Sequence, residues 1–150
     1  MVNEQTLSKM QEMKLPGMAQ LFKDLMGTPA HADLTHDEFV GLLVDAEATH
    51  RANKRLQRLL RNARLKQAAC LEDIDYHQAR GLHKQTVLEL ANCQWIINHQ
   101  NVLITRPTGV GKSYLACALG NAVCRAGYRV MYRRAPRLFT SLFQTRADGS

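Results

Sequence analysis

The first 27 residues carry apolar side chains at helical spacing in two short patterns, "EQTLSKMQEMK" and "MAQLFKDLM". Between them lie Leu15, Pro16 and Gly17, and proline and glycine both interrupt regular structure. The pattern therefore predicts two short helices, separated by a break, whose apolar faces belong to a core.

A long helix is predicted to follow. Thr35 and Glu38 have the spacing of a capping box, in which the two side chains satisfy each other's backbone N–H groups at the start of a helix. From His36 to about Gln67 there is no proline, and no glycine follows Gly41. We therefore expect one helix over this range.

The C-terminal half alternates between helical and strand-like patterns. Residues 82–98 and 113–126 have apolar side chains at helical spacing, and another helix begins at about Pro136. Residues 102–104 form a short apolar run, and the segment "YRVMYRR" is β-rich, so both are predicted to be strands of a parallel sheet. The predicted fold class is α plus α/β, a helical domain followed by the start of a parallel sheet with flanking helices.

This pattern divides the chain into three parts. We predict an N-terminal helical domain over residues 1–68, a connector and helix over residues 69–100, and the first part of an α/β domain over residues 101–150.

Basic residues occupy the second half of the long helix. At about 100° per residue, one stripe contains Arg51, Lys54, Arg55, Arg58 and Lys66, and alanines and leucines occupy another side. The helix therefore has one face that packs and one that is positive.

Two interpretations of the positive stripe are open, a solvated helix face and a contact with nucleic-acid phosphates. The second is favoured because no acidic residue lies between Glu47 and Glu72, so we expect the stripe to lack local i,i+4 partners. The candidate DNA-binding residues are Arg51, Lys54, Arg55, Arg58, Arg61 and Arg64.

Composition supports a folded chain with a polyanionic partner. The 20 Lys and Arg exceed the 13 Asp and Glu, which gives the 150-residue chain a net charge of +7. No apolar run is long enough to cross a bilayer and the N-terminus lacks a signal-peptide core, so we expect a cytoplasmic protein without a membrane partner. The four cysteines show no C-x-x-C spacing and are expected to be reduced, mostly buried thiols.

The segment "RPTGVGKS" matches most of the phosphate-loop pattern G-x-x-x-x-G-K-[ST], with Gly111, Lys112 and Ser113 in place. Gly109 and Gly111 let backbone N–H groups approach an anion, Lys112 would neutralise phosphate, and the Ser113 hydroxyl would be a Mg²⁺ ligand. Arg106 stands where the pattern has its first glycine.

The effect of Arg106 has two interpretations. If this corner needs a positive φ, arginine imposes strain of about 1–3 kcal/mol and weakens binding. In the other interpretation its guanidinium swings outward or touches a phosphate. We favour strain with partial retention of binding.

The sequence resembles the IstB-like ATP-binding proteins, AAA+ helper ATPases of bacterial insertion sequences that are related to DnaC-type helicase loaders. The resemblance rests on "KMQEMKLPGMAQLF", "ACLEDIDY" and "NVLITRPTGVGKSYLACALGNAVCRAGYRVMYRRAPRLF", and it covers nearly the whole chain. It implies a helical domain followed by a P-loop AAA+ domain that binds ATP and Mg²⁺. It also implies DNA binding, homo-oligomeric assembly and a partner transposase of the same element.

By this resemblance the nucleotide contacts are Pro107, Thr108, Gly109, Val110, Gly111, Lys112 and Ser113, with Ser113 on the metal. The chain ends at Ser150, before the Walker B strand, sensor residues and arginine finger of the family. We therefore expect weak ATP binding without useful hydrolysis, and a chain that is either a fragment or a decayed gene copy. No catalytic residue is assigned, and whether the chain is an enzyme stays open.

The resemblance leaves three functions to consider. The leading one is an ATP-binding helper of DNA transposition that binds DNA and regulates a transposase. The second is a helicase-loader-like adaptor whose N-terminal helices dock a replicative helicase. The third is a degenerate fragment that binds DNA through its basic helix and has no nucleotide function.

The substitution Arg106→Gly is expected to tighten ATP binding about tenfold, because removal of about 1.4 kcal/mol of backbone strain changes an affinity by that factor. Titration of labelled ATP against both chains measures the change. An unchanged or weaker affinity would mean that arginine at this corner imposes no strain.

Overall fold

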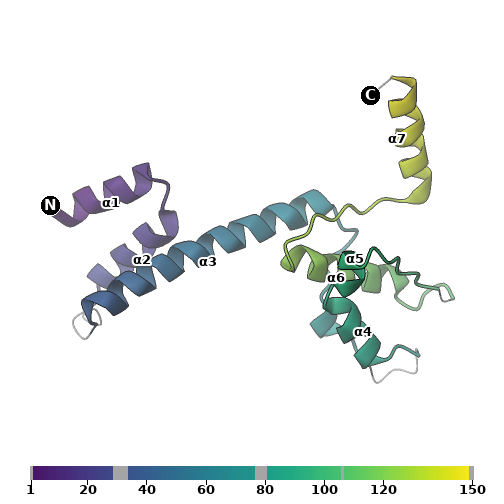
Figure 1. Ribbon diagram of the computed structural model, residues 1–150, viewed down its shortest axis with the longest axis horizontal. Coiled ribbons are helices and arrows are strands. Elements are labelled where there is room, and N and C mark those ends of the chain that lie inside the picture. Colours follow the sequence, from purple (N-terminus) through teal and green to yellow (C-terminus); the bar gives the residue numbers. More distant parts are fainter. Residues whose placement is uncertain (1, 29–33, 77–80, 106, 149–150) are drawn as a thin grey trace. The chain divides into compact units, whose positions relative to one another are not determined.

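The computed structural model describes residues 2–28, 34–76, 81–105 and 107–148 (Figure 1). It divides into two compact units, residues 1–57 and residues 58–150, with the division inside one long helix. The elements in chain order are α1 (Val2–Glu12), α2 (Pro16–Met26), α3 (His36–Ala63), the 3₁₀ helix η2 (Leu71–Asp73), α4 (Lys84–Ala91), α5 (Gln94–Ile97), α6 (Lys112–Arg125) and α7 (Ala135–Ala147).

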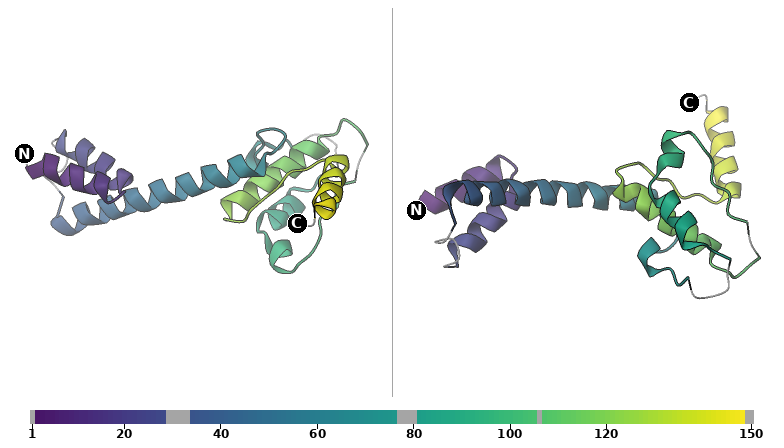
Figure 2. Two further views of the ribbon diagram at one scale, coloured as in Figure 1. Left: turned by 90° about the horizontal axis from the view of Figure 1, so that it is seen from above. Right: turned by 60° about the horizontal axis from the view of Figure 1, so that its bottom comes forward.

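The prediction of an α/β domain with a parallel sheet is wrong. The described residues contain helices and connecting segments but no strand, as the views in Figure 2 also show. Both segments predicted to be strands, residues 102–104 and 128–134, are irregular and pair with no neighbouring strand in the described part of the chain. An apolar, β-branched run becomes a strand only when a second strand takes up its N–H and C=O groups. The side chain of Leu103 is 87% exposed, whereas a central strand of a parallel sheet would bury it.

The start of the long helix is as predicted. The backbone N–H of Thr35 donates to Glu38 Oε2 over 2.9 Å, and the N–H of Glu38 donates to Thr35 Oγ1 over 3.3 Å. These are the two reciprocal bonds of a capping box. The bonds from Thr35 also lower the pKa of the Glu38 carboxyl.

The long helix ends at Ala63, four residues before the predicted end at Gln67. Arg64 adopts a left-handed conformation with φ of 50°, which stops the helical hydrogen-bond pattern. The carbonyl oxygen of Ala63 instead accepts a bond of 2.9 Å from the backbone N–H of Tyr132. A partner 69 positions further along the chain therefore helps to set this end, and helical spacing alone does not show it.

In the first unit, the carboxylate of Glu47 joins α3 to the start of α2. Glu47 is only 6% exposed, and its Oε2 accepts from the backbone N–H groups of Gly17 at 2.8 Å and Met18 at 3.2 Å. Its other oxygen accepts from Arg51 Nε at 2.7 Å. Because no side chain of α2 itself caps that helix, Glu47 satisfies N–H groups that would otherwise lack an acceptor.

The hydrogen bond from Arg51 is the main reason that the pKa of Glu47 is lowered, and burial opposes the shift. The folded state therefore favours the ionised carboxylate. Its contribution to stability is present above the carboxyl's unfolded-state pKa and is lost as the pH falls through the lowered folded-state value.

Gly17 allows α2 to approach α3 closely. A Cβ atom at this position would lie 2.6 Å from the carbonyl oxygen of Ala46 and 2.9 Å from the Cα of Glu47, both of which are backbone atoms. The glycine that marks the break in the sequence is thus also a point of close contact between α2 and α3.

In the second unit, α6 forms the core. Cys117 and Ala118 on this helix are fully buried and form a core with Ala69, which is nearly so. Leu65, Leu71, Tyr114 and Tyr132 pack against these three residues. An ion pair of 2.6 Å between Arg125 and Glu72 joins the end of α6 to η2. The region 82–98, predicted as one helix, is divided into α4 and α5 by Cys93, whose φ is 58°.

The substitution Gly17→Ala is expected to destabilise the first unit by about 1–3 kcal/mol, because the added methyl group meets backbone atoms that cannot rotate away. Gly41→Ala is the matched control, since Gly41 also lies in a helix but has open space around it. The control is expected to be neutral or to stabilise by up to about 1 kcal/mol. Urea unfolding of the whole chain, followed by circular dichroism, measures both changes; equal effects of the two substitutions would contradict the close approach.

Candidate functional site

The predicted phosphate loop is a tight turn that leads directly into α6. Gly109 and Gly111 both have φ of 89°, a region that residues with a side chain rarely adopt. Gly111 is the N-cap of α6, and among the described residues no side chain caps this helix end. The positive end of the α6 dipole therefore lies beside a loop that has no Cβ atoms at Gly109 and Gly111, where they could block an anion.

Lys112 reaches back across this turn. Its Nζ donates to the carbonyl oxygen of Pro107 over 2.7 Å, and its side chain is partly buried. An anion in the loop would offer this ammonium group a charged acceptor, and hydrogen bonds between charged groups are stronger than those between neutral groups. The arrangement fits a phosphate group.

Ser113 is exposed at the second position of α6. Its hydroxyl can serve as one ligand of a magnesium ion that is also bound to nucleotide phosphates. The described residues contain no group of three or more His, Cys, Asp or Glu side chains able to hold a metal ion by themselves. Arg106, the departure from the motif, lies outside the described residues.

A cavity of about 280 Å³ adjoins the loop. Val110, Lys112 and Leu115 line one part of it, and residues 102–105 line another. The connector and α4 add Ile74, Asp75, Gly81, Leu82, Thr86 and Leu90, and the start of α6 adds Gly111 and Tyr114. Most of these side chains are apolar, which suits the flat face of a nucleotide base more than its phosphates.

The sequence interpretation assigned no role to the connector side chains of this cavity. The signal was available in part, since Ile74 and Asp75 belong to the segment "ACLEDIDY" that carries the resemblance. Which of its side chains face the loop depends on the packing of α4 beside α6, and spacing along the chain does not give this.

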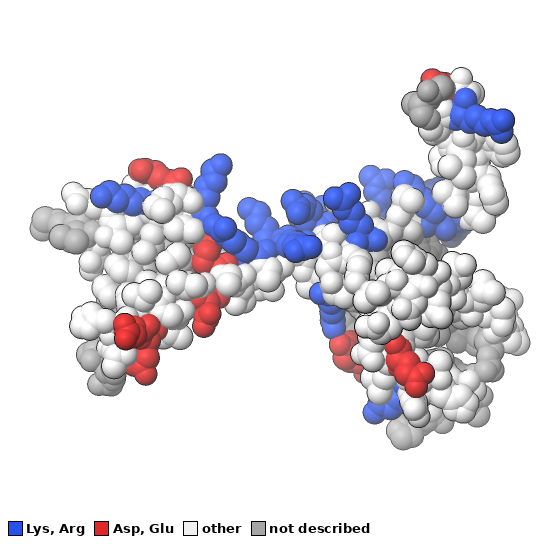
Figure 3. All heavy atoms as spheres, in the orientation of Figure 1, with Lys and Arg blue, Asp and Glu red and all other residues white. Residues whose placement is uncertain are grey.

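The predicted DNA-binding residues are all exposed; Arg51, Lys54, Arg55, Arg58 and Arg61 lie on α3, and Arg64 directly follows it. In Figure 3, Lys and Arg side chains gather along the second half of this helix. The expectation that the stripe lacks local partners is wrong for Arg51, which is paired with Glu47 one helical turn earlier. Arg58 and Arg64 line a groove in the second unit, and Arg61 is not among its lining residues.

The cysteines are all free thiols, and Cys93, Cys117 and Cys124 are buried. Burial raises the pKa of Cys93 and Cys124, which keeps both thiols protonated at neutral pH. Among the described residues, no helix combines the length and the apolar character that crossing a membrane requires.

Comparison with known proteins identifies a family that this chain resembles along most of its length. The family model described as IstB-like ATP binding protein matches residues 8–150. This match includes the phosphate loop, the connector and α3.

The chain belongs to the IstB-like ATP-binding protein family.

Relatives of this IstB-like chain are named as ATP-binding proteins of insertion sequences. One from Pseudomonas fluorescens is 44% identical over 151 residues, which cover 100% of this chain and 65% of the relative. One from Sinorhizobium fredii is 42% identical, with 99% of this chain and 61% of the relative covered. A more distant one, from insertion sequence IS21 of Pseudomonas aeruginosa, is 29% identical and covers 91% of this chain and 51% of its own length. The chain thus spans less than two thirds of the length of these curated relatives.

Proposed function

We propose that this IstB-like chain is an ATP-binding helper of DNA transposition that binds DNA and regulates a partner transposase of the same insertion sequence. The observation that carries the proposal is the turn at Gly109 and Gly111, which opens onto the start of α6 in a chain of a family of ATP-binding proteins. The names of the relatives supply the link to insertion sequences.

In this proposal the triphosphate of ATP lies against the loop from Pro107 to Ser113. The ammonium group of Lys112 leaves the carbonyl oxygen of Pro107 and donates to a phosphate oxygen. The base enters the apolar cavity next to the loop, whose volume of about 280 Å³ is enough for only part of a nucleotide. The phosphates remain at the exposed loop.

Mg²⁺ would accompany ATP as its counter-ion and reduce the negative charge of the phosphates. Within the described residues, Ser113 is the ligand that this chain offers through its hydroxyl group. Binding and orientation of the nucleotide are therefore the roles assigned to these residues, and no catalytic residue is proposed.

DNA is proposed to contact the exposed basic side of α3. At about 100° per residue, Lys54, Arg55 and Arg58 lie within an arc of about 100°, so their side chains project from one side of the helix. Contacts of lysine and arginine with phosphates are independent of base sequence and are weakened by salt. Arg51 is left out of this contact because its guanidinium binds the buried carboxylate of Glu47.

The partner in this proposal is the transposase of the same element, and the ATP-bound state of a homo-oligomeric assembly governs its access to target DNA. Capture of that transposase by the ATP-loaded protein tests this step. Capture that is the same with and without ATP would contradict a regulatory role for the nucleotide.

The substitution Lys112→Ala is expected to weaken ATP binding by at least tenfold, because a hydrogen bond to a charged group contributes about 1.5–3 kcal/mol. Lys84→Ala is the control, since it removes an equal charge from an exposed position outside the loop and its cavity. Titration with labelled ATP measures both. If the wild type and Lys112→Ala bind ATP with equal affinity, the loop is not part of the nucleotide site.

The triple variant Lys54→Ala, Arg55→Ala, Arg58→Ala is expected to weaken binding to unrelated DNA duplexes about equally. It should reduce the slope of log affinity against log salt by about one unit for each lost phosphate contact. Arg51 is left intact because its removal would strand the buried Glu47 carboxylate and weaken the fold.

The control for this experiment is Lys9→Ala, Lys23→Ala, Lys84→Ala, which removes the same charge from exposed positions on α1, α2 and α4. Fluorescence anisotropy with labelled duplexes measures both variants. If the slope of log affinity against log salt is the same in the two variants, the stripe is a solvated helix face without phosphate contacts.

A further inference from the structure

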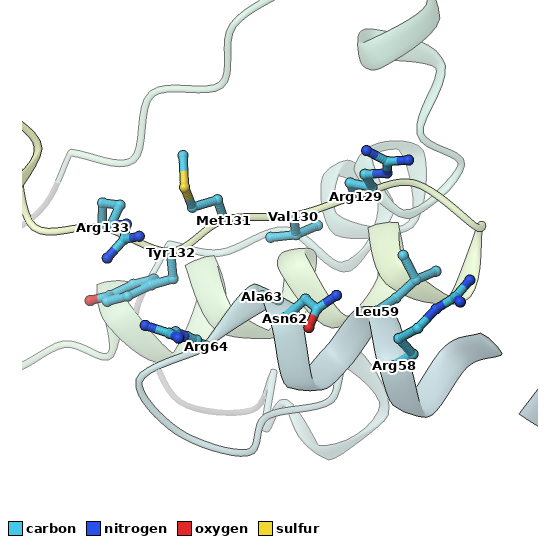
Figure 4. A pocket seen from close by; sticks show the side chains of 10 residues that line it. All are labelled: Arg58, Leu59, Asn62, Ala63, Arg64, Arg129, Val130, Met131, Tyr132 and Arg133. Carbon is cyan, nitrogen blue, oxygen red and sulfur yellow. The ribbon is translucent and has the colours of Figure 1, made fainter. Parts of the chain in front are cut away.

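A groove of about 700 Å³ lies in the second unit between the last turns of α3 and the irregular segment before α7 (Figure 4). Its walls are Arg58, Leu59 and residues 62–64 on one side and residues 129–133 on the other. None of these residues lines the cavity beside the phosphate loop. The groove is therefore a separate feature from the proposed nucleotide site.

The two walls are fastened together by backbone and core contacts. The N–H of Tyr132 donates to the carbonyl oxygen of Ala63 over 2.9 Å, and the Tyr132 side chain packs against the buried residues of α6. Val130 lies near Gly120 of α6, at 3.5 Å from the place that a Cβ there would occupy. Because Val130 and Tyr132 are partly buried while the alternate residues Arg129 and Arg133 are exposed, the packing turns the arginines outward.

Four arginines line the groove and no acidic residue does so among those described. Figure 4 shows Arg64 and Arg133 toward one end and Arg58 and Arg129 toward the other. All four are exposed, and in the described part of the chain none of them has a carboxylate partner. Their charges are thus uncompensated and available to an anion that extends along the groove.

We infer that this groove binds the phosphate backbone of duplex DNA, with Arg129 and Arg133 as a second set of phosphate contacts opposite Arg58 and Arg64. The inference rests on the proposed function, since it extends the DNA contact of α3 to a segment that the sequence suggested only as a strand. Arginine suits this role because its planar guanidinium donates two parallel bonds to one phosphate.

Two features favour duplex DNA over other anions. The arginines lie toward both ends of the groove, which suits the repeated charges of a nucleic-acid backbone rather than one nucleotide. Single strands are usually held by bases stacked on exposed aromatic rings. Tyr132 is the aromatic side chain among the described lining residues, and it packs into the core.

The test compares the variant Arg129→Ala, Arg133→Ala with the wild type in anisotropy titrations of a labelled duplex at several salt concentrations. The variant should reduce the salt slope by about two units, one for each lost phosphate contact. Arg129→Lys, Arg133→Lys retains both charges and should keep a slope near that of the wild type. Arg137→Ala, Arg146→Ala is the control for net charge, because it removes two arginines of α7 that do not line the groove.

The outcomes separate this inference from the proposed function. If the wild type binds duplex DNA and the groove variant has the same slope as the α7 control, the inference is overturned while DNA binding by α3 stands. A wild type that binds no duplex DNA overturns both. A variant that loses affinity for single-stranded RNA, with duplex DNA unaffected, overturns the inference in favour of a different ligand. ATP affinity should be unchanged in the groove variant, and its loss would assign these arginines to the nucleotide site instead.

Discussion

The packing of α6 is the constraint on which the second unit depends. Cys117 and Ala118 have no exposed surface, so this helix cannot shift or rotate without opening the core. The helix begins at Lys112, directly after the turn at Gly111. The position of the proposed phosphate site is therefore fixed by a buried helix face that never touches the ligand.

The same helix also supports the arginine groove. Val130 and Tyr132 pack toward α6, and their burial leaves Arg129 and Arg133 on the outer side of the segment. The two proposed anion sites thus share one structural support but no lining residues. The proposed ATP and DNA contacts therefore involve different side chains.

Local patterns predicted the features that depend on neighbouring residues in the chain. The capping box at Thr35 and Glu38, the start of α7 near Pro136 and the helix after Gly111 could all be predicted in this way. The family could also be recognised, because the phosphate loop and the segment "ACLEDIDY" are contiguous motifs.

Features that depend on distant partners could not be predicted. The prediction of a parallel sheet was wrong because an apolar run indicates a possible strand but does not show whether a second strand pairs with it. The bonds from Gly17 and Met18 to Glu47 are of this kind, since about 30 residues separate the partners. The pair of Glu47 and Arg51 is different, because its i,i+4 spacing is local and could have been recognised in the sequence. Arg129 and Arg133 were overlooked because their segment was considered only for its strand propensity.

Whether the turn before α6 holds the phosphates of ATP is best measured by titration of the ¹⁵N-labelled protein, followed through its backbone amide chemical shifts. ATP should move the amide signals of Gly109, Gly111 and Ser113, while adenosine should move only signals from the adjoining cavity, such as those of Leu82 and Leu115. ATP that leaves the loop amides in place and moves those of residues 58–64 or 129–133 would contradict a phosphate site at this turn.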